Sequence, residues 1–220
     1  MKLFSFFFPK IIHKETSLIN GEIEVVEQFG KRSIRVENLE QSGPMVEKIW
    51  EKALRELLIT HYSLPITKVL ILGLGGGSAL KVINKHFPKA KILGLEVDPI
   101  MVKLGKKYLG LSEYKNLEIK IADVFKWLQD KKLSGLNHLT KFDLILVDLY
   151  LGRKIPKKMM TEEFLKKIKK LLSKNGIVIF NFLRIKKKRL EFEEFFEKLR
   201  KIYGDIKIVK PIANYLIICK

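Results

Sequence analysis

The stretch Val69–Ile83, VLILGLGGGSALKVI, decides the fold. Apolar residues run without a break, give way to the glycines Gly73, Gly75, Gly76 and Gly77, and then resume with helical spacing. This order predicts a buried strand, a tight turn and a helix. Glycines in such a turn let the backbone approach a ligand beside the helix N-terminus. The pattern alone leaves open whether that ligand is a dinucleotide, a phosphate or another adenosine-bearing cofactor.

Strand-like and helix-like segments alternate on the C-terminal side of this stretch. Such alternation predicts a doubly wound parallel sheet. The last two apolar segments, at 206–210 and 214–220, are too close together for a helical crossover, so we expect them to pair antiparallel. The predicted fold class is therefore α/β, a Rossmann-like sheet of seven strands that is mostly parallel and ends in an antiparallel hairpin. The earlier strands are predicted at 68–74, 90–98, 116–123, 142–150 and 176–183, and the helices at 76–86, from 99, and at 124–130, 161–172 and 188–203.

The N-terminal part of the chain has a different pattern. Residues 1–65 are predicted to form a small β-rich subdomain, and residues 66–220 the Rossmann-like domain. Apolar and polar residues alternate on both sides of Phe29-Gly30-Lys31, which predicts a β-hairpin. Helical spacing follows from about Met45 to Ile59, and Pro65 marks the boundary before the next strand.

The first fourteen residues, MKLFSFFFPKIIHK, begin like a signal sequence. Their apolar core is very short, Pro9 and Lys10 interrupt it, and no small-residue cleavage site follows, so we interpret the segment as mature protein. We expect a buried strand here. The alternatives are an apolar arm that packs on a neighbouring subunit and an interfacial membrane contact.

The composition is that of a globular protein. Its 220 residues can enclose one sizeable core with a small appended subdomain, and 47% hydrophobic with 30% charged residues argues against disorder. No apolar run approaches the roughly 20 residues that span a bilayer. Cys219 is the only cysteine, which excludes an intrachain disulfide and favours a cytoplasmic location.

The formal net charge of +19 is the most unusual bulk property. A field of this sign attracts polyanions such as RNA and repels cationic ligands. The alternative is a solvated, lysine-rich surface, because the lysines are spread along the chain and alternate with acids in its C-terminal part.

Three acidic residues stand where predicted strands end. Glu96, Asp123 and Asp148 follow the second, third and fourth strands of the repeating pattern, and ligands of open α/β sheets bind at this edge. Glu96 is placed to bind a ribose, Asp123 an adenine amino group, and Asp148 to face the reacting centre. A pyrophosphate would gain nothing from these charges, whereas a sulfonium cofactor with an ammonium group would tolerate them. The alternative role is helix capping, which we expect for Asp98 before Pro99 and which also fits Asp123.

A resemblance to a known family supports this interpretation. The segments VLILGLGGGSALKVINKHFPKAKILGLEVDP, IKIADVFKWL and FDLILVDLY resemble the spermidine synthase-like branch of the class I methyltransferase-fold proteins. So does FGKRSIRVENLEQSG, where that family carries a small β-rich domain ending in a Gln-Ser pair. The resemblance implies S-adenosylmethionine, its decarboxylated form or methylthioadenosine as cofactor, and a homodimer. With the strand ends, it yields as cofactor-binding candidates Gln41, Gly73, Gly75, Gly76, Gly77, Ser78, Glu96, Val97, Asp123, Val124 and Asp148.

Three departures from the family pattern bear on the reaction. Aminopropyltransferases of this family have an acid where this chain has Gly76, and that acid holds the ammonium of decarboxylated S-adenosylmethionine. A second acid, which binds the polyamine, is here Leu151, and Trp50 replaces a histidine. A buried ammonium without its carboxylate is costly, and a strongly basic protein repels a polycation. These points favour methyl transfer to an unidentified small-molecule acceptor over aminopropyl transfer.

The predicted catalytic residues are Asp148, which would orient the acceptor or take its proton, and Tyr150 beside it as a wall or hydrogen-bond donor. Asn181, at the end of the fifth strand, either completes the acceptor pocket or satisfies local backbone. The four histidines are scattered, so we predict no metal site. Three alternatives stay open: an aminopropyltransferase, a non-catalytic nucleoside- or nucleic-acid-binding module, and a nicotinamide-dependent oxidoreductase.

Overall fold

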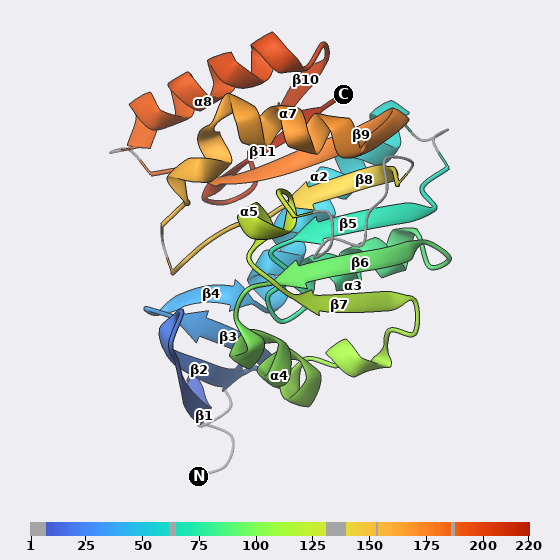
Figure 1. The fold of residues 1–220 in the computed structure, drawn as a ribbon. Helices are drawn as coiled ribbons and strands as arrows, with labels where there is room; N and C mark the ends of the chain where they lie inside the picture. Colours follow the sequence, from blue (N-terminus) through green and yellow to red (C-terminus); the bar gives the residue numbers. More distant parts are fainter. Residues whose placement is uncertain (1–7, 62–64, 131–139, 153, 186–187) are drawn as a thin grey trace.

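The computed structural model describes residues 8–61, 65–130, 140–152, 154–185 and 188–220. Figure 1 shows a large sheet with helices on both of its faces and a small, separate sheet on the side of the N-terminus. Within the described residues, no helix has the length and apolar character needed to cross a bilayer.

The large sheet has seven strands in the order β10-β11-β9-β8-β5-β6-β7. The two pairings of β11, with β10 and with β9, are antiparallel and the other four are parallel, which confirms the predicted parallel sheet with a C-terminal hairpin. The chain winds outward from β5 to β7 and then returns to β8, so the strand order reverses beside β5. The strands are β5 (Lys68–Leu72), β6 (Lys91–Glu96), β7 (Leu117–Ile121), β8 (Phe142–Val147), β9 (Leu172–Leu183), β10 (Ile206–Val209) and β11 (Asn214–Cys219).

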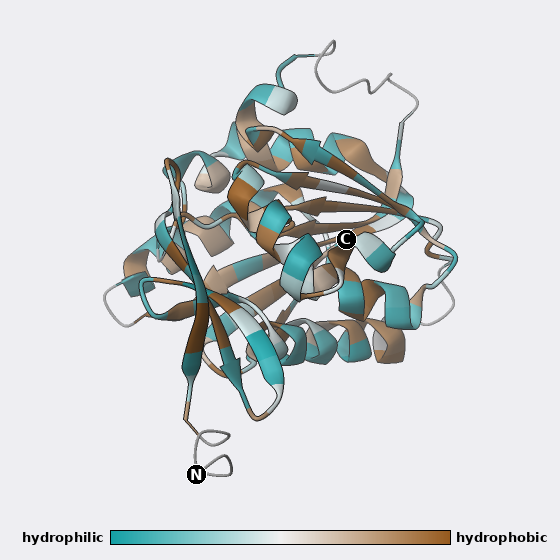
Figure 2. Ribbon diagram, turned by 90° about the horizontal axis from the view of Figure 1, so that it is seen from below, coloured by the Kyte–Doolittle hydropathy of each residue, from teal (hydrophilic) through white to brown (hydrophobic). Residues whose placement is uncertain are grey.

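The unbroken apolar run of β5 reflects burial on both faces. Val69 and Ile71 pack with α2 and α3 on one face, and Leu70 and Leu72 pack with α5, α7 and α8 on the other; all four side chains are fully buried. In Figure 2 the strands of this sheet are mostly brown, whereas teal lies along the helices. The helices are α2 (Pro44–His61), α3 (Ser78–His86), α4 (Pro99–Tyr108), α5 (Val124–Trp127), α7 (Glu162–Leu171) and α8 (Arg189–Ile202), with a short 3₁₀ helix, η2, at Lys157–Met160.

The small sheet is antiparallel, in the order β1-β2-β3-β4. The predicted hairpin is confirmed: Phe29 and Gly30, with φ of 52° and 68°, form the two-residue turn between β2 and β3. One face of this sheet packs on Met101 and Leu104 of α4, which joins the small sheet to the large one. The strands are β1 (Lys10–Ser17), β2 (Gly21–Gln28), β3 (Lys31–Val36) and β4 (Leu39–Ser42).

The N-terminal segment differs in part from its prediction. Residues Lys10–Ser17 do form a strand, but it lies at the edge of the small sheet and only Ser17 is buried. An edge strand has one free side and covers little of the core, so its burial was wrongly predicted. Residues 1–7 lie outside the described chain. The division of the protein at residue 65 stays a prediction.

Candidate functional site

A cavity of about 300 Å³ lies where the carboxyl ends of β5, β6 and β8 meet the small sheet. Glu96 ends β6, Asp123 lies two residues after β7, and Asp148 directly follows β8; all three line this cavity together with Gly75. Gly76 and Gly77 do not line it. The candidate residues that do are Gln41, Gly73, Gly75, Ser78, Glu96, Val97, Asp123, Val124, Asp148, Tyr150 and Asn181.

Gly73 and Gly75 need the freedom of glycine for different reasons. Gly73 has a φ of +89°, and a Cβ there would lie 2.1 Å from the carbonyl oxygen of Asp148, so a side chain would separate β5 from the end of β8. Gly75 has a φ of +55°, and its N–H donates to Oε2 of Glu96 at 2.7 Å. The amide of Gly75 is therefore already used by the protein itself.

Gly76 and Gly77 serve packing and chain direction. A Cβ on Gly76 would lie 2.7 Å from Cδ1 of Ile34 in β3 and 2.9 Å from Cδ1 of Leu109. The N–H of Gly76 donates to Oγ of Ser42 at 2.7 Å. Gly77, with a φ of +98°, turns the chain into α3. The structure thus places Gly76 against β3 and the end of α4, and Gly77 against Leu111; neither glycine lines the cavity, and their contact with a cofactor stays a prediction.

Glu96 is anchored by the backbone around it. Its Oε1 accepts from the N–H groups of Val97 and Asp98 at 2.8 and 3.0 Å, and its Oε2 accepts from Gly75. Burial raises the pKa of Glu96, and these backbone hydrogen bonds oppose the rise. The side chain is 8% exposed, so its orientation is fixed. A second lone pair on Oε2 is available to a hydroxyl group in the cavity.

Asp123 both caps a helix and lines the cavity. Its Oδ1 accepts from the N–H groups of Phe125 and Lys126 at 2.7 and 3.1 Å, at the first turn of α5. The capping role considered for this residue is therefore present in the structure. It does not exclude the predicted contact, because Asp123 also faces the cavity.

Asp98 does more than cap α4. Its Oδ1 accepts from the N–H of Ile100 at 2.9 Å, as expected of a cap. Its Oδ2 also accepts from Oγ of Ser17 at 2.5 Å and from Nδ2 of Asn20 at 2.6 Å. Since Ser17 and Asn20 flank the turn between β1 and β2, this fully buried carboxylate joins the small sheet to the strand ends that form the site.

Asp148 lies at the centre of a network of uncharged donors. Its Oδ1 accepts from Nδ2 of Asn181 at 2.8 Å, and its Oδ2 accepts from the indole Nε1 of Trp50 at 3.1 Å. Asn214 in turn donates from Nδ2 to Oδ1 of Asn181 at 2.7 Å, which fixes the orientation of that amide. Burial raises the pKa of Asp148 to about 6, although both hydrogen bonds oppose the rise. A carboxyl group in this state can exchange a proton near neutral pH.

Tyr150 and Gln41 hold the loop that follows β8. The hydroxyl of Tyr150 donates to the carbonyl oxygen of Asn181 at 3.1 Å, and burial raises its pKa, so the phenol stays protonated. The side chain of Gln41 donates to the carbonyl oxygen of Gly152 at 3.2 Å. Both residues line the cavity, and both fix its wall through backbone contacts.

Two members of the Asp148 network were absent from the predicted site. Trp50 was recognised in the sequence only as a replacement for a histidine, and Asn214 was not singled out. The available signal for Trp50 was that it replaces a family histidine. A residue that departs from the family pattern is worth testing for contact with the catalytic acid. The signal for Asn214 was weaker: it is an amide at the start of an otherwise apolar strand.

The histidines lie away from this site where they are described. His13 contacts Glu15 at 3.3 Å, and His86 contacts Glu51 at 3.2 Å. The side chain of His61 and the whole of His138 fall outside the described part of the chain. In that part, no cluster of three or more His, Cys, Asp and Glu side chains is arranged to hold a metal ion.

Sequence comparison places the chain in a family. The model of the spermine/spermidine synthase domain matches residues 53–217, and the chain therefore belongs to the spermine/spermidine synthase domain family. It is 28% identical to the polyamine aminopropyltransferase of Vibrio vulnificus over 179 residues. This alignment covers 78% of this chain and 58% of that protein. It is 31% identical over 122 residues to the mouse eEF1A lysine and N-terminal methyltransferase, covering 54% of this chain and 17% of that one.

Structural comparison agrees on the fold. A probable spermidine synthase from Corynebacterium glutamicum superposes with a TM-score of 0.76 and 14% identity, over 97% of this chain and 80% of that chain. The chain spans less than two thirds of the length of the two curated relatives named above. The relatives are named for two different reactions, aminopropyl transfer and methyl transfer. The sequence comparison alone does not distinguish between these two reactions for this chain.

Proposed function

We propose that this protein transfers a methyl group from S-adenosylmethionine to a small acceptor bound beside Asp148. The observation that carries the proposal is the packing at Gly76. The family resemblance places the acid that holds the ammonium of the decarboxylated cofactor at this position. Here the chain has no acid, and a Cβ would lie 2.7 Å from Cδ1 of Ile34 and 2.9 Å from Cδ1 of Leu109, so a side chain at this position requires these two side chains to shift.

The cavity fits a cationic nucleoside ligand. No Lys, Arg or His is among its described lining residues. The charged residues that do line it are four acids, Glu40, Glu96, Asp123 and Asp148. The loop amides of Gly75 and Gly76 already donate to Glu96 and Ser42. A dinucleotide pyrophosphate would find neither a cation nor these amides here, which argues against a nicotinamide cofactor.

The residues that would hold S-adenosylmethionine follow from their positions. Glu96 would accept a ribose hydroxyl with the remaining lone pair of Oε2, and Asp123 with Val124 would lie against the adenine. Gly73 and Gly75 would leave room for the amino-acid end. When bound, the cofactor supplies a methyl carbon that its sulfonium makes electrophilic.

The chain's own contribution is to position the acceptor and receive its proton. Trp50 and Asn181 hold the carboxylate of Asp148 in one orientation, with one lone pair of each oxygen still available. Asp148 would take the proton of the attacking hydroxyl or amine as the new bond to the methyl carbon forms. Tyr150 fixes the wall beside it, and correct placement of the nucleophile supplies much of the rate.

Aminopropyl transfer is a second candidate, and one observation favours it. S-adenosylmethionine carries a carboxylate that its decarboxylated form lacks, and no cation among the described lining residues would neutralise that carboxylate. Against this candidate stand Gly76 and Leu151, which replace the two acids that the family resemblance assigns to aminopropyl transfer.

Calorimetry with both cofactor forms tests the choice. We expect S-adenosylmethionine to bind more tightly than decarboxylated S-adenosylmethionine, and turnover to release S-adenosylhomocysteine. Tighter binding of the decarboxylated form, with methylthioadenosine released in the presence of putrescine or spermidine, would establish the second candidate. Absence of binding by either form would contradict both.

A further inference from the structure

The exposed residues that line the cavity, here called its mouth, are apolar, and one acid of the lining, Glu40, lies beside them, where it accepts from the N–H of Met45 at 2.7 Å. Met45 of α2, Leu151 of the loop after β8 and Ile212 of the turn before β11 all line the cavity, yet they are 50, 44 and 55% exposed. They come from three separate segments of the chain. Large apolar side chains that gather around one opening and remain in water indicate a surface that a ligand covers.

Basic residues lie next to the segments that form this apolar mouth. Lys154 pairs through its backbone with Leu151, and Nζ of Lys158 lies 5.9 Å from the ring centroid of Phe125, which lines the cavity. Both lysine side chains are exposed.

Two more basic residues lie beside Ile212. Nη2 of Arg184 donates to the carbonyl oxygen of Ile212 at 2.8 Å. The guanidinium of Arg184 and the ammonium of Lys210 each lie 5.9 Å from the ring centroid of Tyr215. Two cations therefore flank the turn that contributes Ile212 to the mouth.

These four cations are available to a ligand. Among the described residues, none of Lys154, Lys158, Arg184 and Lys210 forms an ion pair with a carboxylate, whereas Lys166 and Lys167 of α7 pair with acids of their own helix. A carboxylate or phosphate that approached the mouth would gain from them, and a polyamine would be repelled.

We propose that the acceptor is a small organic anion, an apolar or aromatic body that bears a carboxylate or phosphate group. Its apolar body would cover Leu151 and Ile212, its anionic group would face the four cations, and its nucleophile would reach Asp148. The cavity is at the small end of ligand pockets, so a cofactor would occupy the interior and leave the mouth to the acceptor. This inference rests on the proposed methyl transfer and names its substrate class.

Three probes of nearly equal size test the charge preference: para-hydroxybenzoate, para-hydroxybenzyl alcohol and tyramine, which are anionic, neutral and cationic. Binding to the full chain saturated with S-adenosylhomocysteine is measured by equilibrium dialysis at low and high salt. We expect the anion to bind about tenfold more tightly than the alcohol and more tightly still than the amine, with the difference shrinking at high salt. Equal binding of all three, or preference for tyramine, would overturn the inference.

Variants of the basic mouth locate the effect. Arg184→Gln and Lys158→Gln should each reduce the preference for para-hydroxybenzoate severalfold, while Lys85→Gln, a cation of α3 that pairs with Glu51 of α2, should leave it unchanged. An unchanged preference in the two mouth variants would contradict the assignment. Calorimetry with S-adenosylhomocysteine is run on the same samples. If this ligand binds but charge preference is absent, only the acceptor class fails; if it does not bind, the proposed function fails first.

Discussion

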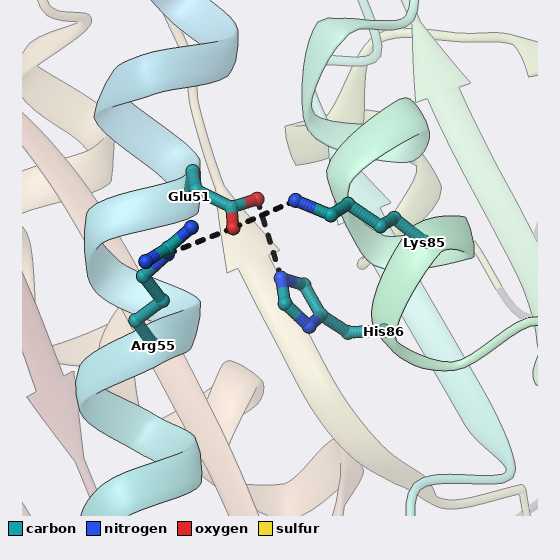
Figure 3. Close-up of polar contacts among 4 residues, drawn as sticks. All are labelled: Glu51, Arg55, Lys85 and His86. Carbon is teal, nitrogen blue, oxygen red and sulfur yellow. Dashed lines mark hydrogen bonds and ion pairs between the residues drawn. The ribbon is translucent and has the colours of Figure 1, made fainter.

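Two neighbouring residues of α2 belong to two different carboxylate sites. Trp50 points into the core and donates to Asp148, a contact between neutral and acidic groups. Glu51, the next residue, faces α3 and accepts from Arg55 at 2.9 Å, Lys85 at 3.0 Å and His86 at 3.2 Å, as Figure 3 shows.

The two carboxyl groups therefore titrate in different ranges. Burial raises the pKa of Asp148 to about 6, because only neutral donors oppose it. Burial would also raise the pKa of Glu51, but the hydrogen bonds from Lys85, Arg55 and His86 together lower it to about 2. The charge of the donors, more than burial itself, decides which acid can exchange protons at neutral pH and which remains a permanent anion.

The largest expected effect concerns activity. Asp148→Asn should lower the rate of transfer by about 100-fold or more, because it removes the proton acceptor while it preserves the size of the side chain. Glu51→Gln is the matched control and should leave the rate unchanged. Initial rates and far-ultraviolet circular dichroism on both variants check this. A Glu51→Gln variant that loses as much activity as Asp148→Asn would remove the functional distinction between the two acids.

The pH dependence of the rate is the next test. Asp148 must be ionised to accept a proton, so the wild-type rate should rise with pH through a midpoint near 6. Trp50→Phe removes a hydrogen bond that favours the ionised form, so the midpoint should move to higher pH, by about one pH unit if the bond contributes about 1.5 kcal/mol. Rate profiles of both proteins measure this. A midpoint that stays in place in Trp50→Phe would mean that the indole does not tune Asp148.

The position of Asp148 could be predicted from the sequence, whereas its hydrogen bonds could not, because their other partners lie far from it in the chain. Asp148 was found because it follows an apolar run, and the carboxyl ends of parallel strands share one edge of the sheet. Its contact with Trp50 spans 98 residues and depends on how α2 packs on the sheet, which no local pattern encodes. Asn214 reaches Asn181 because β11 pairs beside β9.

Gly76 shows a different limit of sequence reasoning. A glycine that makes room for a ligand and a glycine that makes room for the protein's own side chains give the same pattern in the sequence. Only the positions of Ile34 and Leu109, from two separate segments, show that Gly76 belongs to the second kind. The loop therefore borders the cavity through Gly73 and Gly75, while the cofactor contact of each glycine stays a prediction.

The next prediction concerns stability and the second acid, Glu51, and its expected effect is smaller than the effects on activity. Glu51→Gln should lower the free energy of unfolding by about 1 to 2 kcal/mol at pH 7, since three partly exposed contacts are lost. The pKa of Glu51 is lowered from its ordinary value of 4.5, so the ionised form stabilises the fold above pH 4.5 and this contribution is lost as the pH falls toward 2. Urea unfolding at several pH values measures the difference between wild type and variant. A difference that persists unchanged at pH 2 would rule out an electrostatic origin.

The smallest effect separates the partners of Glu51. Arg55 lies four residues further along α2, so Arg55→Gln removes a pair within one helix and should cost about 0.5 kcal/mol or less. Lys85 lies on α3, so Lys85→Gln removes a link between two helices and should cost more, up to about 1 kcal/mol. The two cations are similarly exposed, at 67 and 61%, so a difference in solvent screening does not explain unequal losses. Urea midpoints at low and high salt compare them. If the Arg55 variant is the less stable of the two, the carboxylate of Glu51 acts within α2 and does not hold α2 against α3.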